Sequence, residues 1–224
     1  MHTLILASSS IYRRQMLSKI TDDYQWVIPE FTEDHTLSED PVRLAIELAK
    51  GKARSVADQF PVRPGQSTTI IGCDQVCFLP AEPAMGTEST DPPRFLHKPG
   101  DLSQAVESLM ACSGKRVCYQ CGVHILHNPV SQFDTPDGNP QLTTQEISFS
   151  DAYWLQFREF SEAEAVRYCE LDEPYDCAGA IKTESYGIRL IASHHGSDPY
   201  TLQGLPLIKL REQLISLGIA LGNL

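Results

Sequence analysis

At 224 residues, the chain is long enough for one large domain, and its 42% hydrophobic and 21% charged residues are ordinary for a soluble globular protein. The net charge of −11 argues against binding to nucleic acid or a membrane surface, because both need an extended basic face. No stretch approaches the roughly 18 uninterrupted apolar residues of a membrane span, and the N-terminus lacks the basic region of a signal peptide. The composition therefore predicts a cytoplasmic protein, in which an anionic ligand needs a local basic pocket.

The seven cysteines, an odd number, lie mostly inside apolar runs, which favours buried free thiols over a disulfide framework. Cys118 and Cys121 have a CxxC spacing, but the run from Val117 to Val123 has the character of a strand. Residues three apart on a strand point to opposite faces of the sheet. We therefore expect these two thiols neither to share a metal nor to form a redox pair.

Residues 4–17 combine an apolar run of strand length, three serines and a helix-like pattern. Arg13 and Arg14 fall in the first turn of that helix, where unpaired backbone N–H groups already carry partial positive charge. An external phosphate would neutralise both arginines, and guanidinium groups suit phosphate oxygens. A serine N-cap followed by two solvated arginines explains the same pattern. The residues of this stretch leave both interpretations open.

A second strand is predicted at residues 24–29, and an acidic loop follows it. Asp40 and Pro41 then match the N-cap and first position of a helix that is expected to run to about residue 57. Lys52 lies on that helix, where a lysine either faces a pocket or is simply solvated.

Asp74 lies in the middle of the most apolar strand candidate of the chain, residues 68–79. Burial of a carboxylate costs several kcal/mol unless the group is paired, bound to a metal or protonated. An aspartate in such a place indicates a chemical site. The alternative is an aspartate that caps a neighbouring turn.

The remaining elements alternate between helices, strands and loops, which is typical of an α/β sheet protein. Two polar, proline-containing stretches, at about residues 80–95 and 128–145, are predicted as exposed loops. Lys98 precedes a proline that restrains its backbone to an extended form, which suits a fixed phosphate contact or a surface lysine equally well. The other predicted elements are a helix at 101–111, strands at 115–126 and 146–157, a helix opened by the capping box of Ser161 and Glu164, a loop at 194–200 and an amphipathic helix ending near Leu217.

Seven segments, in this order, resemble the Maf family of nucleoside triphosphate pyrophosphatases. They are LILASSSIYRR, DPVRLAIELAKGKA, IIGCDQV, HKPGDLSQAVESLMACSGK, FREFSEAEAVRYC, EPYDCAGAIKTESYG and GLPLIKL. The resemblance covers the chain except for residues 80–95 and 128–145, which look like insertions. It implies one domain over residues 1–224, with a twisted mixed sheet, flanking helices and two lobes around a deep cleft. It also implies hydrolysis of a nucleoside triphosphate to a monophosphate and pyrophosphate, with Mg²⁺ or Mn²⁺.

The resemblance assigns roles to individual positions of this chain. Asp74 matches the family's catalytic aspartate, a proton acceptor or metal ligand. Ser8, Arg13, Lys52 and Lys98 match residues expected around the triphosphate. These assignments predict one polyphosphate pocket built from separate parts of the chain.

Three further positions separate the subfamilies, and here they are Tyr12, Gln75 and Glu184. The branch that acts on dTTP and UTP has Arg, Thr and Gln there, whereas the 7-methyl-GTP branch has Trp, Gln and Glu. The chain is therefore similar to the second branch. A methylated guanine carries positive charge, so Tyr12 can stack on it, and Glu184 can accept from its N1 and N2 donors. Tyr is a weaker π-donor than Trp, which predicts a lower affinity.

Two positions depart from the family pattern. The family's Ser-Pro before the arginine turn is Ser10-Ile11 here, and its Asp-Glu pair in the acidic loop is Asp34-His35. If the family glutamate helps to hold the metal, Glu33 or Asp34 has to replace it. The expected metal ligands are Asp74 and Glu33.

The resemblance leaves two other functions open. One is a pyrophosphatase that acts on dTTP, UTP or another modified nucleotide. The other is a nucleotide-binding regulator of septum formation that needs no hydrolysis. The expected partner is the nucleotide itself, with neither nucleic acid nor a membrane, and a homodimer is left open by the sequence.

Overall fold

The fold is built on a mixed sheet with the strand order β2-β1-β3-β5-β6-β7, and β4 pairs with β3 beside this path. The computed structural model describes residues 2–61, 65–81, 92–129 and 144–221. β1 is parallel to β2 and β3, and the remaining pairs are antiparallel. The strands are β1 (His2–Ala7), β2 (Gln25–Val27), β3 (Ser67–Leu79), β4 (Arg94–Leu96), β5 (Arg116–Asn128), β6 (Gln145–Phe157) and β7 (Ile191–Gly196). This arrangement confirms the α/β class and the mixed sheet.

The helices begin where capping residues satisfy their first backbone N–H groups. The side chains of Ser10, Asp40, Asp101 and Ser161 each accept a hydrogen bond from the turn that follows, and Glu164 completes a capping box. The helices are α1 (Ile11–Leu17), α2 (Pro41–Ala57), α3 (Leu102–Cys112), α4 (Glu162–Asp172) and α5 (Leu207–Ser216), with 3-10 turns η1 (Ala178–Ala180), η2 (Tyr186–Leu190) and η3 (Pro199–Thr201).

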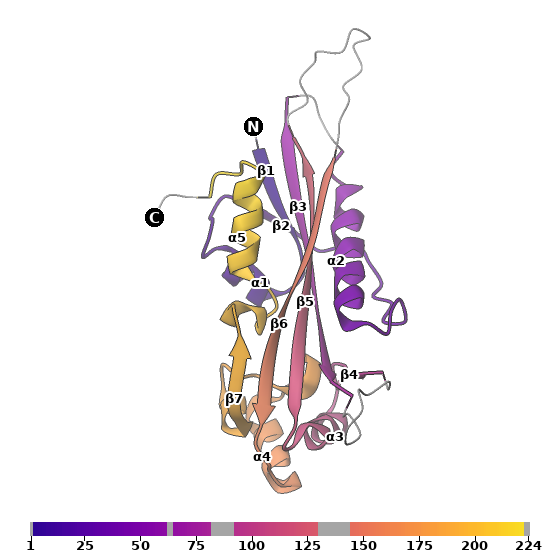
Figure 1. Cartoon of the computed structure of the whole chain (residues 1–224), viewed down its shortest axis with the longest axis vertical. Helices are drawn as coiled ribbons and strands as arrows, with labels where there is room; N and C mark the ends of the chain where they lie inside the picture. Colours follow the sequence, from indigo (N-terminus) through magenta and orange to yellow (C-terminus); the bar gives the residue numbers. More distant parts are fainter. Residues whose placement is uncertain (1, 62–64, 82–91, 130–143, 222–224) are drawn as a thin grey trace, which may run out of the picture.

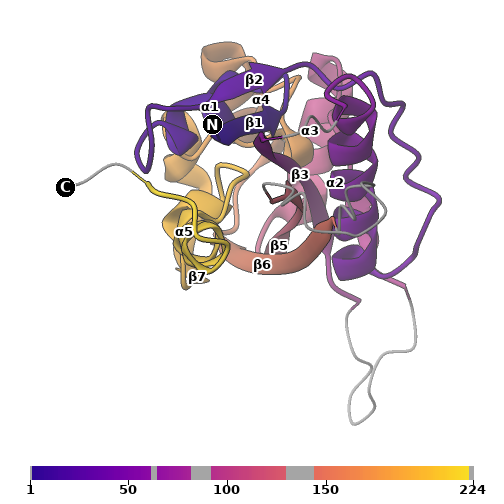
Figure 2. The same cartoon turned by 90° about the horizontal axis from the view of Figure 1, so that it is seen from above.

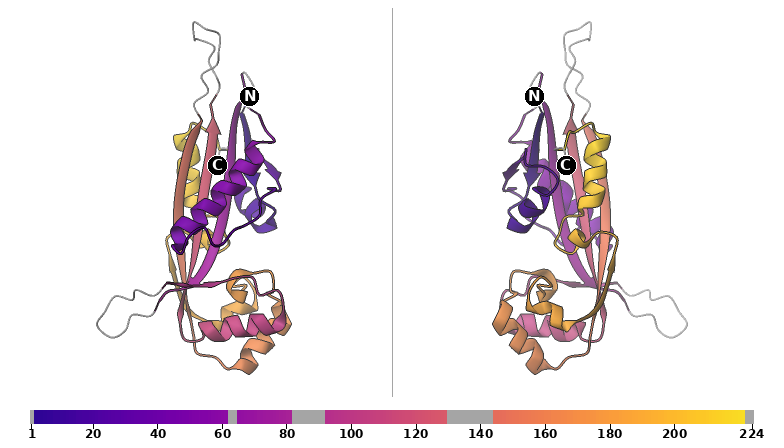
Figure 3. Two further views of the ribbon diagram at one scale, coloured as in Figure 1. Left: turned by 90° about the vertical axis from the view of Figure 1, so that its right-hand side faces the viewer. Right: turned by 90° about the vertical axis from the view of Figure 1, so that its left-hand side faces the viewer.

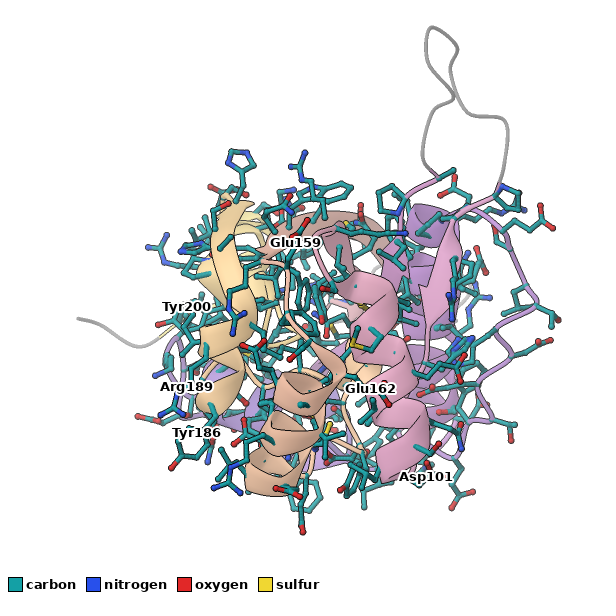
Figure 4. All side chains as sticks on the ribbon, turned by 90° about the horizontal axis from the view of Figure 1, so that it is seen from below. Asp101, Glu159, Glu162, Tyr186, Arg189 and Tyr200 are labelled. Atoms are coloured by element: carbon teal, nitrogen blue, oxygen red, sulfur yellow. The ribbon has the colours of Figure 1, made fainter. Side chains whose placement is uncertain are left out.

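Helices cover both faces of the sheet, as Figures 1 and 2 show: α2 lies on one face, and α1 and α5 lie on the other. α3 and α4 form a separate group at one end of the long strands (Figure 3), around a core of its own. Figure 4 looks at this end and labels Asp101 and Glu162, which stand at the starts of the two helices. β3 and β5 run from one end of the sheet to the other. One sheet therefore carries the residues that pack against α1, α2 and α5 and also the residues that pack against α3 and α4. That residues 1–224 form a single two-lobed domain stays a prediction.

Several elements differ from the sequence prediction. His194 to Gly196 were expected in a loop, but they belong to β7, which pairs with β6. Their sequence lacks apolar alternation, so pairing with a neighbouring strand decides their conformation. Of the two expected insertions, residues 82–91 and 130–143 lie outside the described residues. Arg94 and Phe95, expected in the first of these loops, pair with β3 as part of β4.

None of the helices in the described residues has the length and hydrophobicity needed to cross a bilayer.

Glycine at position 72 allows α2 to lie directly on β3. A Cβ there would overlap the carbonyl oxygen of Ala49 and lie 2.8 Å from the backbone nitrogen of Ala53. Gly122 on β5 is in the same situation beneath Ala45. Residues two apart on a strand share a face, so this close contact also brings Asp74 under the helix.

We expect Gly72→Ala to lower the free energy of unfolding by about 1–3 kcal/mol, because added volume in a packed interface forces the backbone to shift. Urea denaturation measures the effect. Gly51→Ala is the matched control, since the three atoms nearest to its added Cβ all belong to the side-chain ring of Phe31 and not to backbone, and alanine favours the helix. A loss of stability for Gly51→Ala as large as that for Gly72→Ala would contradict the argument.

Candidate active site

A cavity of about 740 Å³ lies where α1, α2, β3, β4 and the residues from 176 to 184 meet. All but one of the site residues predicted from the sequence line it. They are Tyr12, Arg13, Glu33, Lys52, Asp74, Gln75, Lys98 and Glu184. These residues come from distant parts of the chain, and the tertiary structure brings them together around one space.

Ser8 is the exception. It is buried at the end of β1, and its hydroxyl accepts a hydrogen bond of 3.1 Å from the backbone nitrogen of Ser10. Ser9 and Ser10 line the cavity in its place. The first serine is thus a structural part of the strand-to-helix turn, and the following two reach the surface of the site.

The ammonium group of Lys52 lies between charged residues that line the cavity. Its Nζ bonds Asp74 Oδ1 and lies 2.5 Å from Glu33 Oε1. Lys52 and Asp74 are both buried, whereas the Glu33 side chain is 36% exposed. Burial opposes ionisation of Glu33, but the charge and hydrogen bond of Lys52 outweigh it and lower the pKa of that carboxyl. Asp74 is therefore a paired buried carboxylate rather than a turn cap.

The two arginines of α1 have different surroundings. Arg13 lines the cavity, and its Nε donates a hydrogen bond of 2.9 Å to the carbonyl oxygen of Gly204. Burial acts to lower the pKa of Arg13, but nearby acidic groups, Cys73 and Asp74 first, raise it overall. Arg14 instead stacks on Trp26, with its guanidinium carbon 4.1 Å from the ring centroid. Of these two arginines, Arg13 is the one that lines the cavity, where it can meet an anion.

His97 is a cavity residue that the sequence analysis missed. It lies beside His35, with the two ring centroids 5.1 Å apart and the rings edge to face. Burial, and to a lesser degree His35, lower the pKa of His97. His35 Nε2 in turn lies 3.5 Å from Glu33 Oε2. The signal available in the sequence was the position of His97 directly before Lys98.

Other residues that line the cavity are apolar or aromatic. They include Val76, Cys77, Phe95, Leu96, Tyr119 and Ile181. Tyr12, with 45% of its surface exposed, and Glu184 also line the cavity. Pockets with apolar walls and a few convergent polar groups are typical of small-molecule sites.

An α/β sheet protein with a cavity lined by cations, carboxylates and apolar side chains belongs to the class whose site suits a small anionic organic molecule. The family comparison identifies the chain more closely. Residues 3–217 match the Maf family, described as "Maf-like protein", and the chain belongs to that family. The resemblance found in the sequence is thereby confirmed.

The curated relatives match the chain over nearly its whole length. A protein of Alcanivorax borkumensis named 7-methyl-GTP pyrophosphatase is 38% identical over 219 residues, 98% of this chain and 96% of the relative. A protein of the same name from Hahella chejuensis is 37% identical over 209 residues, 93% of this chain and 90% of the relative. The structure of the Staphylococcus aureus Ham1 protein aligns with a TM-score of 0.37 at 15% identity, over 70% of this chain and 72% of that chain. That likeness is too weak to support an argument.

Proposed function

We propose that this protein hydrolyses 7-methyl-GTP to 7-methyl-GMP and pyrophosphate. The cavity that joins Asp74, Lys52 and Arg13 to Tyr12 and Glu184 is the observation that carries the proposal. The names of the full-length relatives support it as well. Such a reaction removes a modified nucleotide from the cellular pool.

The apolar and aromatic residues that line the cavity suit the base. A 7-methylguanine ring is planar and positively charged, so the exposed ring of Tyr12 stacks on it more strongly than on a neutral base. The carboxylate of Glu184 accepts hydrogen bonds from the N1 and N2 donors of guanine. The pyrimidine bases of dTTP and UTP are neutral and offer the single donor N3–H, so both attractions are weaker, which disfavours dTTP and UTP.

The cationic residues that line the cavity suit the triphosphate. Within the described part of the chain, the Arg13 side chain makes one hydrogen bond, through Nε, so its two terminal nitrogens are left to bind phosphate oxygens. Lys52 and Lys98 line the same cavity and add two further charges. Phosphoryl transfer depends mainly on positioning and neutralisation of charge, and these three cations provide both.

Asp74 activates water in the proposed reaction. It is a buried carboxylate beside the phosphate-binding cations, the position that a general base needs. A bound triphosphate competes for Lys52 Nζ, which frees an oxygen of Asp74 to accept a proton from the attacking water. The water adds to the α-phosphorus, the bond to the β-phosphate oxygen breaks, and pyrophosphate leaves.

The residues present fit a divalent cation. Asp74 from β3 and Glu33 from the loop before α2 reach the same ammonium group, and Mg²⁺ is usually held by one or two carboxylates together with substrate phosphates. Among the described residues there is no group of three or more His, Cys, Asp or Glu side chains arranged to hold an ion. We infer that Asp74 and Glu33 would hold Mg²⁺ or Mn²⁺ with the substrate, where the metal supplies charge neutralisation.

The experiment that tests this function measures pyrophosphate release from 7-methyl-GTP, GTP, dTTP and UTP with Mg²⁺ or Mn²⁺. We expect the highest kcat/KM for 7-methyl-GTP. A preference for dTTP or UTP would favour the other branch of the family. Tight nucleotide binding without any pyrophosphate release would favour a regulator of septum formation.

The cytoplasmic location and a homodimer stay predictions.

Tyr12→Leu is expected to lower kcat/KM for 7-methyl-GTP by about 2- to 30-fold and to change that for UTP much less, because a cation–π interaction contributes about 0.5–2 kcal/mol. Steady-state pyrophosphate release with both nucleotides measures the difference. Tyr186→Leu is the matched control. Tyr186 is 42% exposed, stacks with Arg189 outside the cavity lining, and is labelled with it in Figure 4. Equal losses for both nucleotides in Tyr12→Leu would contradict base stacking.

A further inference from the structure

The turn formed by Thr201–Gly204 accepts hydrogen bonds from residues of the site. Gln75 Nε2 donates to the carbonyl oxygens of Thr201 at 2.8 Å and Leu202 at 3.2 Å. The resemblance assigns Gln75 to base selection, but its side-chain amide nitrogen hydrogen-bonds to the protein itself. Gln75 holds this turn, and Leu202 of the same turn lines the cavity.

The other end of this 201–204 turn holds Arg13. The carbonyl oxygen of Gly204 accepts hydrogen bonds from Arg13 Nε at 2.9 Å and from Cys73 Sγ at 3.0 Å. Gly204 has φ of 99°, and a Cβ there would lie 3.2 Å from Arg13 Nε. A guanidinium held at Nε keeps its planar fork in one orientation, with both terminal nitrogens still available to a phosphate.

The 201–204 turn is itself anchored from behind. Thr201 is fully buried, and its hydroxyl donates to Asp151 Oδ2 at 2.6 Å. Asp151, on β6, is also buried, and its Oδ1 lies 2.7 Å from Lys209 Nζ of α5. Neither Thr201 nor Asp151 lines the cavity. Their contact therefore acts on the site only through the turn.

The 201–204 turn makes more hydrogen bonds to the rest of the protein than a turn needs in order to connect two elements. Turns normally lie on the surface, where water satisfies their carbonyl groups. Here side chains from α1, β3 and β5 bind the carbonyl oxygens of the 201–204 turn, and β6 binds its threonine hydroxyl. A turn held from four elements is rigid, and rigidity matters where a cation has to match the oxygens of a ligand.

We propose that the 201–204 turn is a positioning element of the substrate site, in which the Thr201–Asp151 hydrogen bond fixes the turn and the turn orients the Arg13 guanidinium toward the triphosphate. Thr201 and Asp151 are positioning residues, since they act through Arg13 and touch no substrate. The inference rests on the proposed function in one respect, that the ligand of Arg13 is a polyphosphate.

A double-mutant cycle on the full chain tests the proposal, with inorganic tripolyphosphate as the probe and its affinity measured by titration calorimetry. Thr201→Val keeps the shape of the side chain and removes the hydroxyl. We expect it to weaken binding by about 10-fold, the size of one charge-assisted hydrogen bond. Thr201→Ser, which keeps the hydroxyl, is expected to restore most of the affinity. Thr21→Val, at a buried threonine outside the cavity lining, is the matched control and is expected to leave binding unchanged.

The decisive comparison uses Arg13→Ala as the background. If the 201–204 turn acts through Arg13, Thr201→Val has no further effect on tripolyphosphate affinity there. Additive losses would overturn the proposal, and so would unchanged affinity in Thr201→Val or a wild-type protein that does not bind tripolyphosphate. Thr201→Ala replaces Thr201→Val in the cycle if circular dichroism shows that the valine variant does not fold.

Failure of the proposed function gives a different result. A wild-type protein that releases no pyrophosphate from any nucleotide, yet shows the Thr201–Arg13 coupling with tripolyphosphate, would refute hydrolysis and leave the positioning role intact. With hydrolysis present, Thr201→Val is expected to raise KM for 7-methyl-GTP while kcat changes less. A fall in kcat at constant KM would indicate a smaller folded fraction and would count against positioning.

Discussion

Replacing Asp74 by asparagine is expected to lower kcat for 7-methyl-GTP by about 10²- to 10⁴-fold, the usual contribution of a general base. Asparagine has nearly the same shape as aspartate but takes up no proton from water at neutral pH. Because Asp74 is buried and bonded to Lys52, the change removes charge and basicity without opening the cavity. Pyrophosphate release at saturating nucleotide and metal measures kcat.

Asp22→Asn is the control for this prediction, because Asp22 is exposed and outside the cavity lining. Its kcat is expected to equal that of the wild type. Near-normal turnover of Asp74→Asn with excess metal would show that the catalytic assignment is wrong. Partial recovery of kcat as the metal concentration rises would show that the loss comes from weakened metal binding, the second role proposed for Asp74, and not from the missing base.

Lys52→Met is expected to have the largest effect on stability, a loss of about 3 kcal/mol in the free energy of unfolding. Removal of one partner from a buried ion pair costs about 3–5 kcal/mol, because the other charge is left uncompensated. We expect the lower end of this range of free energies. Glu33 is partly exposed, so water screens its charge, whereas Asp74 stays buried. Urea denaturation at neutral pH in the absence of nucleotide measures the change.

The pH dependence of the Lys52→Met variant distinguishes charge from packing. In the wild type, the charge and hydrogen bond of Lys52 outweigh burial and hold the pKa of Glu33 below its unfolded value. Such a group contributes stability that is present above the unfolded pKa and is lost as the pH falls through the folded pKa, and Lys52→Met lacks this contribution. The deficit relative to the wild type is therefore expected to be smaller near pH 4 than at pH 8. A deficit independent of pH would contradict this account.

Lys50→Met provides the matched control on the same helix. Lys50 pairs with Glu47 across one turn at 3.7 Å, and exposed pairs of this kind contribute about 0–1 kcal/mol. We expect its stability to stay close to that of the wild type. A loss as large as that in Lys52→Met would mean that any lysine-to-methionine change in α2 is harmful.

Local chemistry explains which elements could be predicted. Asp40 was expected as an N-cap, and it accepts hydrogen bonds from the helix that follows it. Ser161 and Glu164 were expected as a capping box, and both hydrogen bonds of that box are present. The strand around Asp74 was evident from its apolar residues, and the structure extends it over Ser67–Leu79. In contrast, β7 was missed, because its backbone is extended only where β6 provides a partner. Local residues specify caps and apolar runs, whereas edge pairing depends on what lies alongside.

In the candidate site, too, some features could be predicted from local sequence and others depend on tertiary neighbours. Eight of the predicted residues line one cavity, which the family motifs anticipated, but their partners did not follow from the motifs. Arg13 and Arg14 are neighbours in one helix turn, yet one faces the cavity and the other stacks on Trp26. His97 reaches the cavity beside His35, although the motif that contains His97 pointed only to its neighbour Lys98.

The sequence by itself determined the residue types of this protein's site and the elements that carry them, because capping, apolar periodicity and the family motifs are properties of short segments. The tertiary structure alone decided that Lys52 bonds both Asp74 and Glu33, and that Gly204 holds Arg13. Such contacts join residues far apart in the chain, and their geometry depends on how closely a helix lies on a sheet. Gly72 permits that approach, but only the packed structure shows which side chains it brings into contact.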